Sequence, residues 1–332
     1  MNVLSLFDGM SCGQIALNKL GANIKSYYAS EIDKYAIKVA KENFPTTIHV
    51  GDVTKLDGNS FVNESKIDLL MGGSPCQGFS KSGNRLNFED PRSKLFFEFV
   101  RILRQCKPKY FLLENVVMNK ESQAIITEYL GVEPIEINSN LVSAQSRRRL
   151  YWTNIPNVTI PKDKGILVKD ILEDNGIADL VINQGKHLYR ADIKKSHCLM
   201  ARDYKGFGNQ SMTGVRRVGT AFNINGHDYL KRVYDVNGKS PTLTTCGGGN
   251  TEPKIPISEK HWRRLTPLEC ERLQTVPDNY TSSVSNTQRY KMLGNGWTVD
   301  VIAHLFKNIT TKGVTYEPKQ SAKDLFSVNA RG

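Results

Sequence analysis

A cysteine, Cys76, follows a proline in the stretch MGGSPCQGFS, at residues 71–80. Glycines and serines surround it, so it lacks the apolar neighbours that a packing cysteine would have. A presented thiol can act as a nucleophile through its thiolate, a few per cent of which exists at neutral pH when the pKa is about 8.5. The alternative is a buried cysteine that serves as a small hydrophobic residue. The local context favours the nucleophile.

An acid that could assist such a nucleophile is Glu114, which ends the apolar run Tyr110–Leu113. Apolar surroundings favour the neutral form of a carboxyl, so a protonated Glu114 could donate a hydrogen bond to a ring nitrogen of an electrophilic substrate. An acid held in a salt bridge is the open alternative.

A glycine-containing loop and two further acids have the spacing of a nucleotide site. The loop from Phe7 to Gly13 loosely resembles the turn that brings a backbone close to a cofactor, although a plain tight turn is as compatible. Glu31 follows about 20 residues later, where an acid would bind ribose hydroxyls; a helix-cap acid is the alternative. Asp52 could accept from an adenine amino group or form a Gly-Asp turn.

These residues would be positioned by alternating strand and helix patterns, which are typical of a parallel α/β sheet. Strands are predicted at 3–7, 25–30, 47–50, 67–71, 109–115 and 148–154. Helices are predicted at 14–20, from Asp33 onward, at 94–103, from Thr266 onward with a capping box, and at 296–309. Because ligands bind beyond the carboxyl ends of parallel strands, the residues above are expected along one edge of the sheet.

The composition is that of a globular protein with a basic surface. The chain has 332 residues, of which 39% are hydrophobic, and a net charge of +12, which suggests a polyanionic partner such as nucleic acid. No apolar run would span a bilayer, and the start MNVLSLFDGM lacks signal-peptide features, so we expect a cytoplasmic protein with reduced thiols. The six cysteines form no C-x-x-C pair, and we expect no metal site.

The pattern of residues changes near position 160 and again near 257. Residues 1–164 and 258–332 carry the strand and helix signals, and we expect them to form one catalytic and cofactor-binding domain. Residues 165–257 are rich in Gly, Asn, Thr and basic residues, which predicts a smaller, loop-rich domain that meets an anionic surface.

Nine blocks of the sequence together resemble the DNA cytosine-5 methyltransferase family. They are, in order, SLFDGMSCG, SEID around Glu31, GDV (51–53), GGSPCQGFS, LLENV (112–116), AQSRRR (144–149), SPTLTTCGGGN (240–250), RRLTPLECERLQ (263–274) and LGNGWTVDVIAHLF (293–306). The combination of Pro-Cys-Gln, Glu-Asn-Val and Gln-x-Arg-x-Arg at these spacings is highly specific. The length and the Gly-Asn-Gly-Trp ending are most similar to the catalytic domain of the animal de novo enzymes and their small bacterial or phage relatives.

The resemblance implies a Rossmann-like, S-adenosylmethionine-dependent methyltransferase fold with a smaller, loop-rich target-recognition domain. It implies that Cys76 attacks carbon-6 of a cytosine flipped out of duplex DNA, while Glu114 bonds to the ring nitrogen and amino group. Carbon-5 would then take a methyl group from S-adenosylmethionine. Arg149 would hold the exocyclic oxygen of the base, and Arg147 would steady the catalytic loop or its phosphates.

The resemblance also implies which residues bind the cofactor and the DNA. The cofactor residues would be Phe7, Gly9, Glu31, Ile32, Asp52, Val53, Pro75, Leu95, Asn295 and Val299. The DNA-binding residues would be Gln77, Ser80, Lys81, Ser82, Arg85, Tyr229, Arg232 and Thr242. Of these, Ser82 would fill the gap that the flipped base leaves. The partner would be double-stranded DNA, and a cognate restriction endonuclease is left open as a second partner.

Three other interpretations have to be weighed against this one. A tRNA cytosine-5 methyltransferase shares the motifs, but the basic 165–257 region is larger than a tRNA-directed enzyme needs. A catalytically inactive DNA-binding subunit would have no need of intact Cys76, Glu114 and Arg149. A Rossmann dehydrogenase would require a fuller glycine fingerprint and would have no use for Cys76. DNA methylation is therefore the favoured function.

Overall fold

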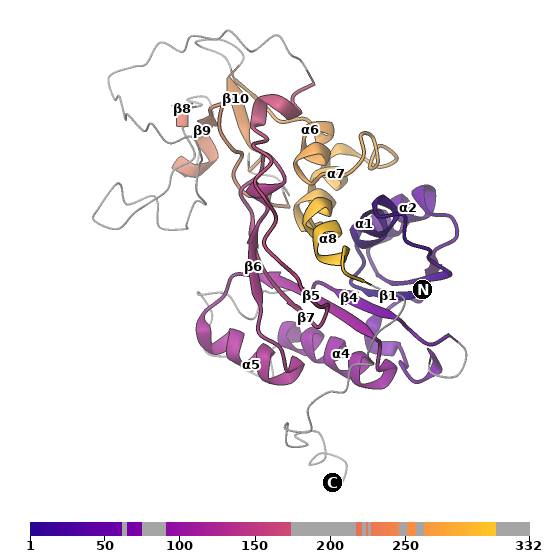
Figure 1. Cartoon of the computed structure of the whole chain (residues 1–332). Helices are drawn as coiled ribbons and strands as arrows, with labels where there is room; N and C mark the ends of the chain where they lie inside the picture. Colours follow the sequence, from indigo (N-terminus) through magenta and orange to yellow (C-terminus); the bar gives the residue numbers. More distant parts are fainter. Residues whose placement is uncertain are drawn as a thin grey trace.

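The computed structural model describes residues 1–61, 65–74, 91–173, 217–220, 224, 227–245, 251–256 and 262–309. A seven-stranded sheet lies at the centre of the fold (Figure 1). Its strands are β1 (Asn2–Leu6), β2 (Ser26–Ser30), β3 (Ile48–His49), β4 (Leu69–Gly72), β5 (Tyr110–Val116), β6 (Ile135–Asn138) and β7 (Arg148–Thr153). The order across the sheet is β3-β2-β1-β4-β5-β7-β6. Strand β7 alone runs in the opposite direction to the other six. The predicted α/β class is confirmed, with this one reversed strand.

Side chains of the central strands alternate between two hydrophobic clusters, one on each face of the sheet. Along β4, Leu69 and Met71 belong to one cluster and Leu70 to the other, because successive side chains of a strand point to opposite faces. The first cluster is covered by α1 (Cys12–Lys19), α2 (Lys34–Asn43) and α8 (Val299–Phe306). The second is covered by α4 (Pro91–Cys106) and α5 (Lys120–Leu130), on the opposite side in Figure 1. The sheet is thus buried on both faces, as parallel sheets are.

Two helix starts follow from local capping chemistry. The Asp33 side chain accepts hydrogen bonds from the main-chain N–H groups of Tyr35 and Ala36 at the start of α2. At α6 (Pro267–Leu273), Thr266 and Glu269 form a capping box, and Pro267 takes the first helical position. Both features were predicted from the sequence and are confirmed.

The helix predicted over 296–309 begins later than expected. The structure has α7 (Asn286–Asn295), then an extended backbone at Gly296 with φ −66° and ψ 163°, and then α8 from Val299. The Gly296 carbonyl accepts hydrogen bonds from Arg147 and Gln274 instead of joining a helix. The prediction was wrong because these partners come from distant parts of the chain, and a helical pattern gives no sign of them.

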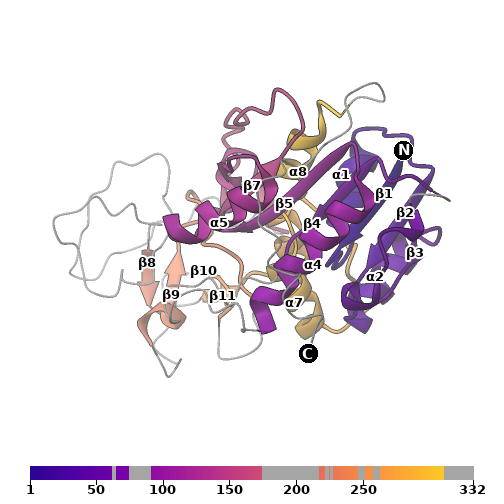
Figure 2. The ribbon, with the colours of Figure 1, turned by 90° about the horizontal axis from the view of Figure 1, so that it is seen from below.

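A second, four-stranded sheet lies beside the large one (Figure 2). It consists of β8 (Arg217–Thr220), β9 (Arg232–Tyr234), β10 (Lys254–Pro256) and β11 (Trp262–Arg264), in the order β11-β10-β9-β8. Its outermost strand β11 pairs antiparallel with β10, although the sequence assigned residues from 258 onward to the catalytic domain. The small sheet therefore takes strands from both sides of the predicted boundary at 257.

The described part of the chain offers neither a membrane span nor a metal site. None of its helices is both long and apolar enough to cross a bilayer. Within the same residues, no three His, Cys, Asp or Glu side chains come together in a way that would hold a metal ion.

Candidate active site

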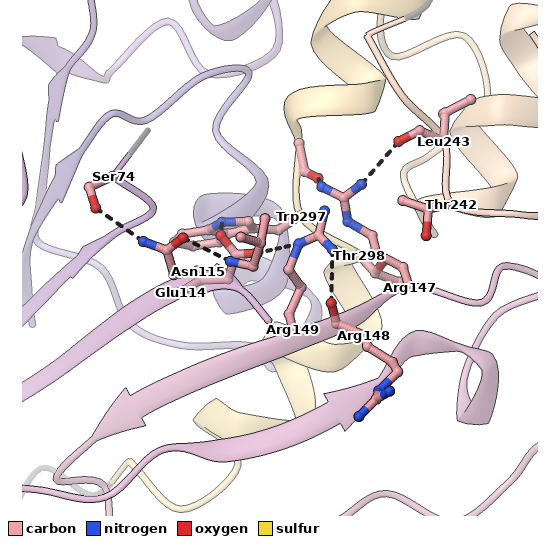
Figure 3. A network of polar contacts seen from close by, with 12 residues as sticks. Ser74, Glu114, Asn115, Arg147, Arg148, Arg149, Thr242, Leu243, Trp297 and Thr298 are labelled. Atoms are coloured by element: carbon pink, nitrogen blue, oxygen red, sulfur yellow. Dashed lines mark hydrogen bonds and ion pairs between the residues drawn. The ribbon is translucent and has the colours of Figure 1, made fainter. Parts of the chain in front are cut away.

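The Glu114 carboxylate lies at the end of β5 and receives a donor on each oxygen (Figure 3). Arg149 on β7 places its Nε 2.9 Å from Oε1 of Glu114. Trp297, in the turn between α7 and α8, donates from Nε1 to Oε2 over 3.2 Å. Glu114 is only 8% exposed, so these contacts form with little competition from water. Of the two interpretations that the sequence left open, the structure has the salt-bridged acid.

The chain that leads toward Cys76 leaves β4 directly beside this carboxylate. A Cβ on Gly73 would lie 2.9 Å from Nε1 of Trp297 and 3.0 Å from Oε2 of Glu114, so only glycine fits there without a shift. The Ser74 hydroxyl accepts from Nδ2 of Asn115 over 3.4 Å, next to Glu114. Cys76 itself lies outside the described residues, as do Pro75, Gln77, Ser80, Lys81, Ser82 and Arg85.

Arg147, expected to steady the catalytic loop or its phosphates, is buried and bonded to two main-chain carbonyls. It is 6% exposed, and its guanidinium donates to the carbonyls of Leu243 (3.1 Å) and Gly296 (3.2 Å). Burial lowers the pKa of Arg147 to about 9, with the charge of Arg149 as the next cause, so the guanidinium still carries its proton at neutral pH. Arg147 therefore joins two main-chain segments that are far apart in the sequence.

The segment 240–245 is wedged between residues 144–147 and α7. Gln145 is fully buried, and its Oε1 accepts from the main-chain N–H of Leu243 over 2.8 Å. A Cβ on Gly294 would lie 1.9 Å from the carbonyl oxygen of Thr244, so the helix meets this segment backbone to backbone. Thr242, expected to contact a phosphate, donates its hydroxyl proton to the Ser146 carbonyl over 2.8 Å. In this structure the hydroxyl proton is thus used within the protein, and the predicted contact of Thr242 with a phosphate stays a prediction.

The loop after β1 has the strained backbone expected of a ligand-binding turn. Phe7, Gly9 and Ser11 have φ values of 56°, 58° and 62°, in the left-handed region that non-glycine residues rarely adopt. The Glu31 carboxylate closes the loop, because Oε2 accepts from the Gly9 N–H over 2.8 Å and Oε1 from the Ile32 N–H over 2.7 Å. The structure thus brings together three of the predicted cofactor residues: Gly9, Glu31 and Ile32.

Asp8 supports this loop from inside the protein. Its carboxylate accepts from the hydroxyls of Ser11 and Tyr27, the latter over 2.7 Å. Burial raises the pKa of Asp8 to about 6, and these hydrogen bonds offset only part of that rise. From the sequence, Asp8 has no expected role beyond its place in the loop.

The remaining predicted cofactor residues divide into two groups. Asp52 caps a short 3-10 helix (Val53–Lys55) by accepting from the Thr54 N–H over 2.9 Å, and that hydrogen bond lowers its pKa. Phe7 and Leu95 are half-buried and pack, with buried Val53, on the cluster beneath α4. Phe7, Asp52 and Val53 follow β1 and β3, as expected, whereas Leu95 lies in α4.

The two cofactor residues predicted near the C-terminus differ in their exposure to solvent. Asn295 is exposed at the last position of α7. The Val299 side chain is fully buried in the core, and its N–H donates to the Gln274 carbonyl over 2.9 Å. In this structure Val299 therefore stabilises α8, and its predicted contact with a cofactor is not supported.

The two predicted DNA contacts lie at the start of β9 and in the 3-10 helix (Asp228–Lys231) just before it. Tyr229 is 56% exposed and stacks on His227, with ring centroids 6.0 Å apart. Arg232 has a side chain only 12% exposed and pairs with Asp228 over 3.0 Å. The exposed Tyr229 ring can thus contact a partner. Arg232 would have to break its ion pair with Asp228 before it could bind a phosphate.

Sequence reasoning missed two residues of the Glu114 network, Trp297 and Gly73. Trp297 was part of a recognised block, Gly-Asn-Gly-Trp, and an aromatic N–H beside a glycine turn was the available signal. Gly73 lies just after β4, where a glycine often marks a close approach of backbone and side chain. A pocket of about 770 Å³ lies elsewhere, between α1 and residues 275–280, and contains no residue of this network. Glu114 is therefore the centre of the candidate site because of its contacts, not because of a large pocket.

Comparisons with known proteins agree with this geometry. Residues 1–311 match the family described as C-5 cytosine-specific DNA methylase. The type II methyltransferase M.HpaII of Haemophilus parainfluenzae is 30% identical, over 93% of this chain and 89% of its own. The type II methyltransferase M.HhaI of Haemophilus parahaemolyticus is 29% identical, over 93% and 94%. Among solved structures, the methyltransferase EhMeth of Entamoeba histolytica shares the fold, with a TM-score of 0.64 at 19% identity over 92% of this chain and 98% of its own.

Proposed function

The chain belongs to the C-5 cytosine-specific DNA methylases, and we propose that it methylates a cytosine flipped out of duplex DNA, with Cys76 as the nucleophile. The observation that carries the proposal is the position of Glu114, bound by Arg149 at the end of β5, beside the chain that leads to Cys76. The enzyme uses S-adenosylmethionine as methyl donor, in common with its family.

The length of chain between the described residues and Cys76 supports its assignment as nucleophile. Ser74 is bonded to Asn115, the neighbour of Glu114, and two residues further along the chain span at most about 7 Å. A cytosine ring between the sulfur and the carboxylate would need a separation of that order. The thiolate would form a bond to carbon-6, which makes carbon-5 nucleophilic.

Glu114 and Arg149 would act on the polar edge of the base. Glu114 would accept a hydrogen bond from the amino group and, in its protonated form, would donate one to the ring nitrogen, which favours the electron shift toward carbon-5. Arg149, which already lies against Glu114, offers its guanidinium to the exocyclic oxygen. After methylation, loss of the carbon-5 proton and departure of the Cys76 sulfur restore the aromatic ring.

The residues at the ends of β1 and β2 fit S-adenosylmethionine. A Cβ built on Gly9 meets no atom within 4 Å, so the loop leaves room for a ligand, and Glu31 is tied to the same loop by the Gly9 N–H. Ile32 is 75% exposed, and an apolar side chain so exposed beside an acid suits the face of an adenine ring. When bound, S-adenosylmethionine supplies an electrophilic methyl group on its sulfonium. The Glu31 carboxylate would bind the ribose hydroxyls, and Asp52 would accept from the adenine amino group.

Transfer of labelled methyl groups tests the proposal. We expect the wild-type protein to label duplex DNA and leave tRNA unlabelled, and Cys76→Ala to lose transfer while it still binds S-adenosylmethionine. Label found only in tRNA would overturn the choice of substrate. Full activity of Cys76→Ala would overturn the assignment of the nucleophile.

The relatives named as type II methyltransferases support a cognate restriction endonuclease as a partner. In that case the methylated site is one that the endonuclease would cut, and the protein acts in the cytoplasm where the DNA lies. Bisulfite sequencing of DNA from a host that expresses this chain identifies the site. Resistance of that DNA to an endonuclease specific for the same site then tests the partnership.

A further inference from the structure

Trp297 is bonded directly to Glu114, and its neighbour Gly296 is bonded to Arg147. Its Nε1 donates to Oε2 of Glu114 over 3.2 Å, opposite the donor that Arg149 places on Oε1. With a donor on each oxygen, the carboxylate plane is fixed before any base arrives. Trp297 also packs against α1, since a Cβ on Gly13 would lie 3.5 Å from the indole ring.

The residue before Trp297 is held by Arg147. The Arg147 guanidinium donates to the Gly296 carbonyl and to the Leu243 carbonyl, so one buried cation joins the turn that carries Trp297 to the segment 240–245. Gln274 adds a second donor to the Gly296 carbonyl over 3.3 Å. Because the two carbonyls share one planar guanidinium, loss of the bond to Leu243 removes a restraint on the same group that holds Gly296.

We propose that Arg147 and Trp297 are positioning residues that form a relay, through which docking of the segment 240–245 orients the Glu114 carboxylate. The order of contacts is Leu243, Arg147, Gly296–Trp297 and Glu114. Since β9 (Arg232–Tyr234) precedes this segment in the chain, the relay connects the small sheet to the catalytic acid. It makes catalysis depend on the docked state of the segment, and it rests on the proposed role of Glu114.

The relay can be followed without any turnover, through the indole N–H signals in a nuclear magnetic resonance spectrum. The chain has three tryptophans, Trp152, Trp262 and Trp297, and the signal lost in Trp297→Phe identifies that residue. We expect Glu114→Ala to shift this signal, because the acceptor of its hydrogen bond is gone. Arg147→Lys should shift it as well, although residue 147 makes no contact with the indole N–H. An unmoved Trp297 signal in folded Arg147→Lys overturns the relay.

Methyl-transfer kinetics then test the consequence for Glu114. Trp297→Phe keeps an aromatic side chain and removes the N–H donor. We expect kcat to fall between about tenfold and 100-fold, and the KM for S-adenosylmethionine to stay within about twofold of wild type. The matched control is Trp152→Phe, whose N–H is bonded to Thr127 in the opposite core cluster, and its kcat should stay within about twofold of wild type. An unchanged kcat in Trp297→Phe overturns the positioning role.

Combination of the variants separates a relay from two independent effects. Arg147→Lys should reduce kcat much less in the Trp297→Phe background than in the wild type. If the fold-losses of kcat in the two single variants multiply in the double variant, the relay is overturned. If Arg147→Lys fails to fold, Gly294→Ala gives a second test, because its Cβ would displace Thr244, next to Leu243. A wild-type protein that transfers no methyl to DNA would refute the proposed function alone, since the indole signals still report the relay.

Discussion

The Nε atom of Arg149 lies 2.9 Å from Oε1 of Glu114, although the two residues are not opposite each other in the sheet. Glu114 pairs with Tyr151, and Arg149 pairs with Val116. They are diagonal neighbours across an antiparallel ladder, a distance that an arginine side chain can bridge. The reversed direction of β7 therefore brings the start of one strand, with Arg149, to the end of another, with Glu114.

Replacement of Arg149 by lysine should abolish most of the activity. A lysine keeps the charge but lacks the planar fork that can bind Glu114 and a base together, so we expect kcat/KM to fall by at least about 100-fold. Steady-state methyl transfer to duplex DNA provides the measurement. The matched control is Arg148→Lys, at a half-exposed side chain that pairs with Glu136, and it should stay within about twofold of wild type. Equal losses in both variants would contradict a specific role for Arg149.

Gly73→Ala should separate Trp297 from Glu114. The added Cβ would lie 2.9 Å from the indole nitrogen and 3.0 Å from the carboxylate oxygen, so at least one of the two must move. We expect a loss of methyl transfer of about tenfold or more with a small change in thermal stability. Gly238→Ala is the control, since the nearest atom to its Cβ would be a carbonyl oxygen at 3.4 Å. Wild-type activity in Gly73→Ala would show that the close contact has no catalytic importance.

Glu271→Gln should destabilise the C-terminal helices. Glu271 is fully buried and pairs with Arg289 over 2.9 Å, so the variant leaves a largely buried guanidinium without its counter-charge. We expect the free energy of unfolding to fall by about 3 kcal/mol, as measured by urea denaturation. Glu42→Gln breaks the exposed pair with Lys38 and should cost less than about 0.5 kcal/mol. A similar small loss in both variants would contradict the importance of burial.

Asp8 should make stability fall as the pH rises. Its pKa is raised from 3.8 to about 6 by burial, so the folded protein binds this proton more tightly than the unfolded chain. The stabilisation is therefore fully present below about pH 4 and is lost as the pH rises through about 6. Relative to Asp8→Asn, which cannot titrate, the wild type should lose unfolding free energy between about pH 4 and pH 7. A constant difference in urea titrations across that range would contradict the raised pKa.

The elements that carry the site could be predicted because each has a local cause. The apolar run before Glu114 predicts a buried strand, and Asp33 and Thr266 predict helix starts through hydrogen bonds to their own turns. The contact between Glu31 and the Gly9 loop also follows from a local rule, since parallel strands bring their carboxyl ends to one edge.

The contacts that the sequence did not predict join residues far apart in the chain. Arg147 was expected to steady the catalytic loop or its phosphates, and its bonds to the carbonyls of Leu243 and Gly296 were not predicted. Trp297 reads as one more apolar residue of a helix, but the extended backbone at Gly296 directs its N–H to Glu114. Val299 was expected to face a cofactor, whereas core packing buries it. In each case the partner is set by tertiary packing, for which neither spacing nor residue type is a guide.

The backbone-to-backbone contact between Gly294 and Thr244 has a consequence for protein engineering. Grafting a different sequence specificity onto this scaffold requires a splice point, and residue 257, where the composition changes, would be the obvious choice. A splice there would replace residues 240–245 with the corresponding residues of another enzyme, which pack against a different α7. Chimaeras joined ahead of Ser240 would keep the native fit with α7 and should retain turnover while their target site changes.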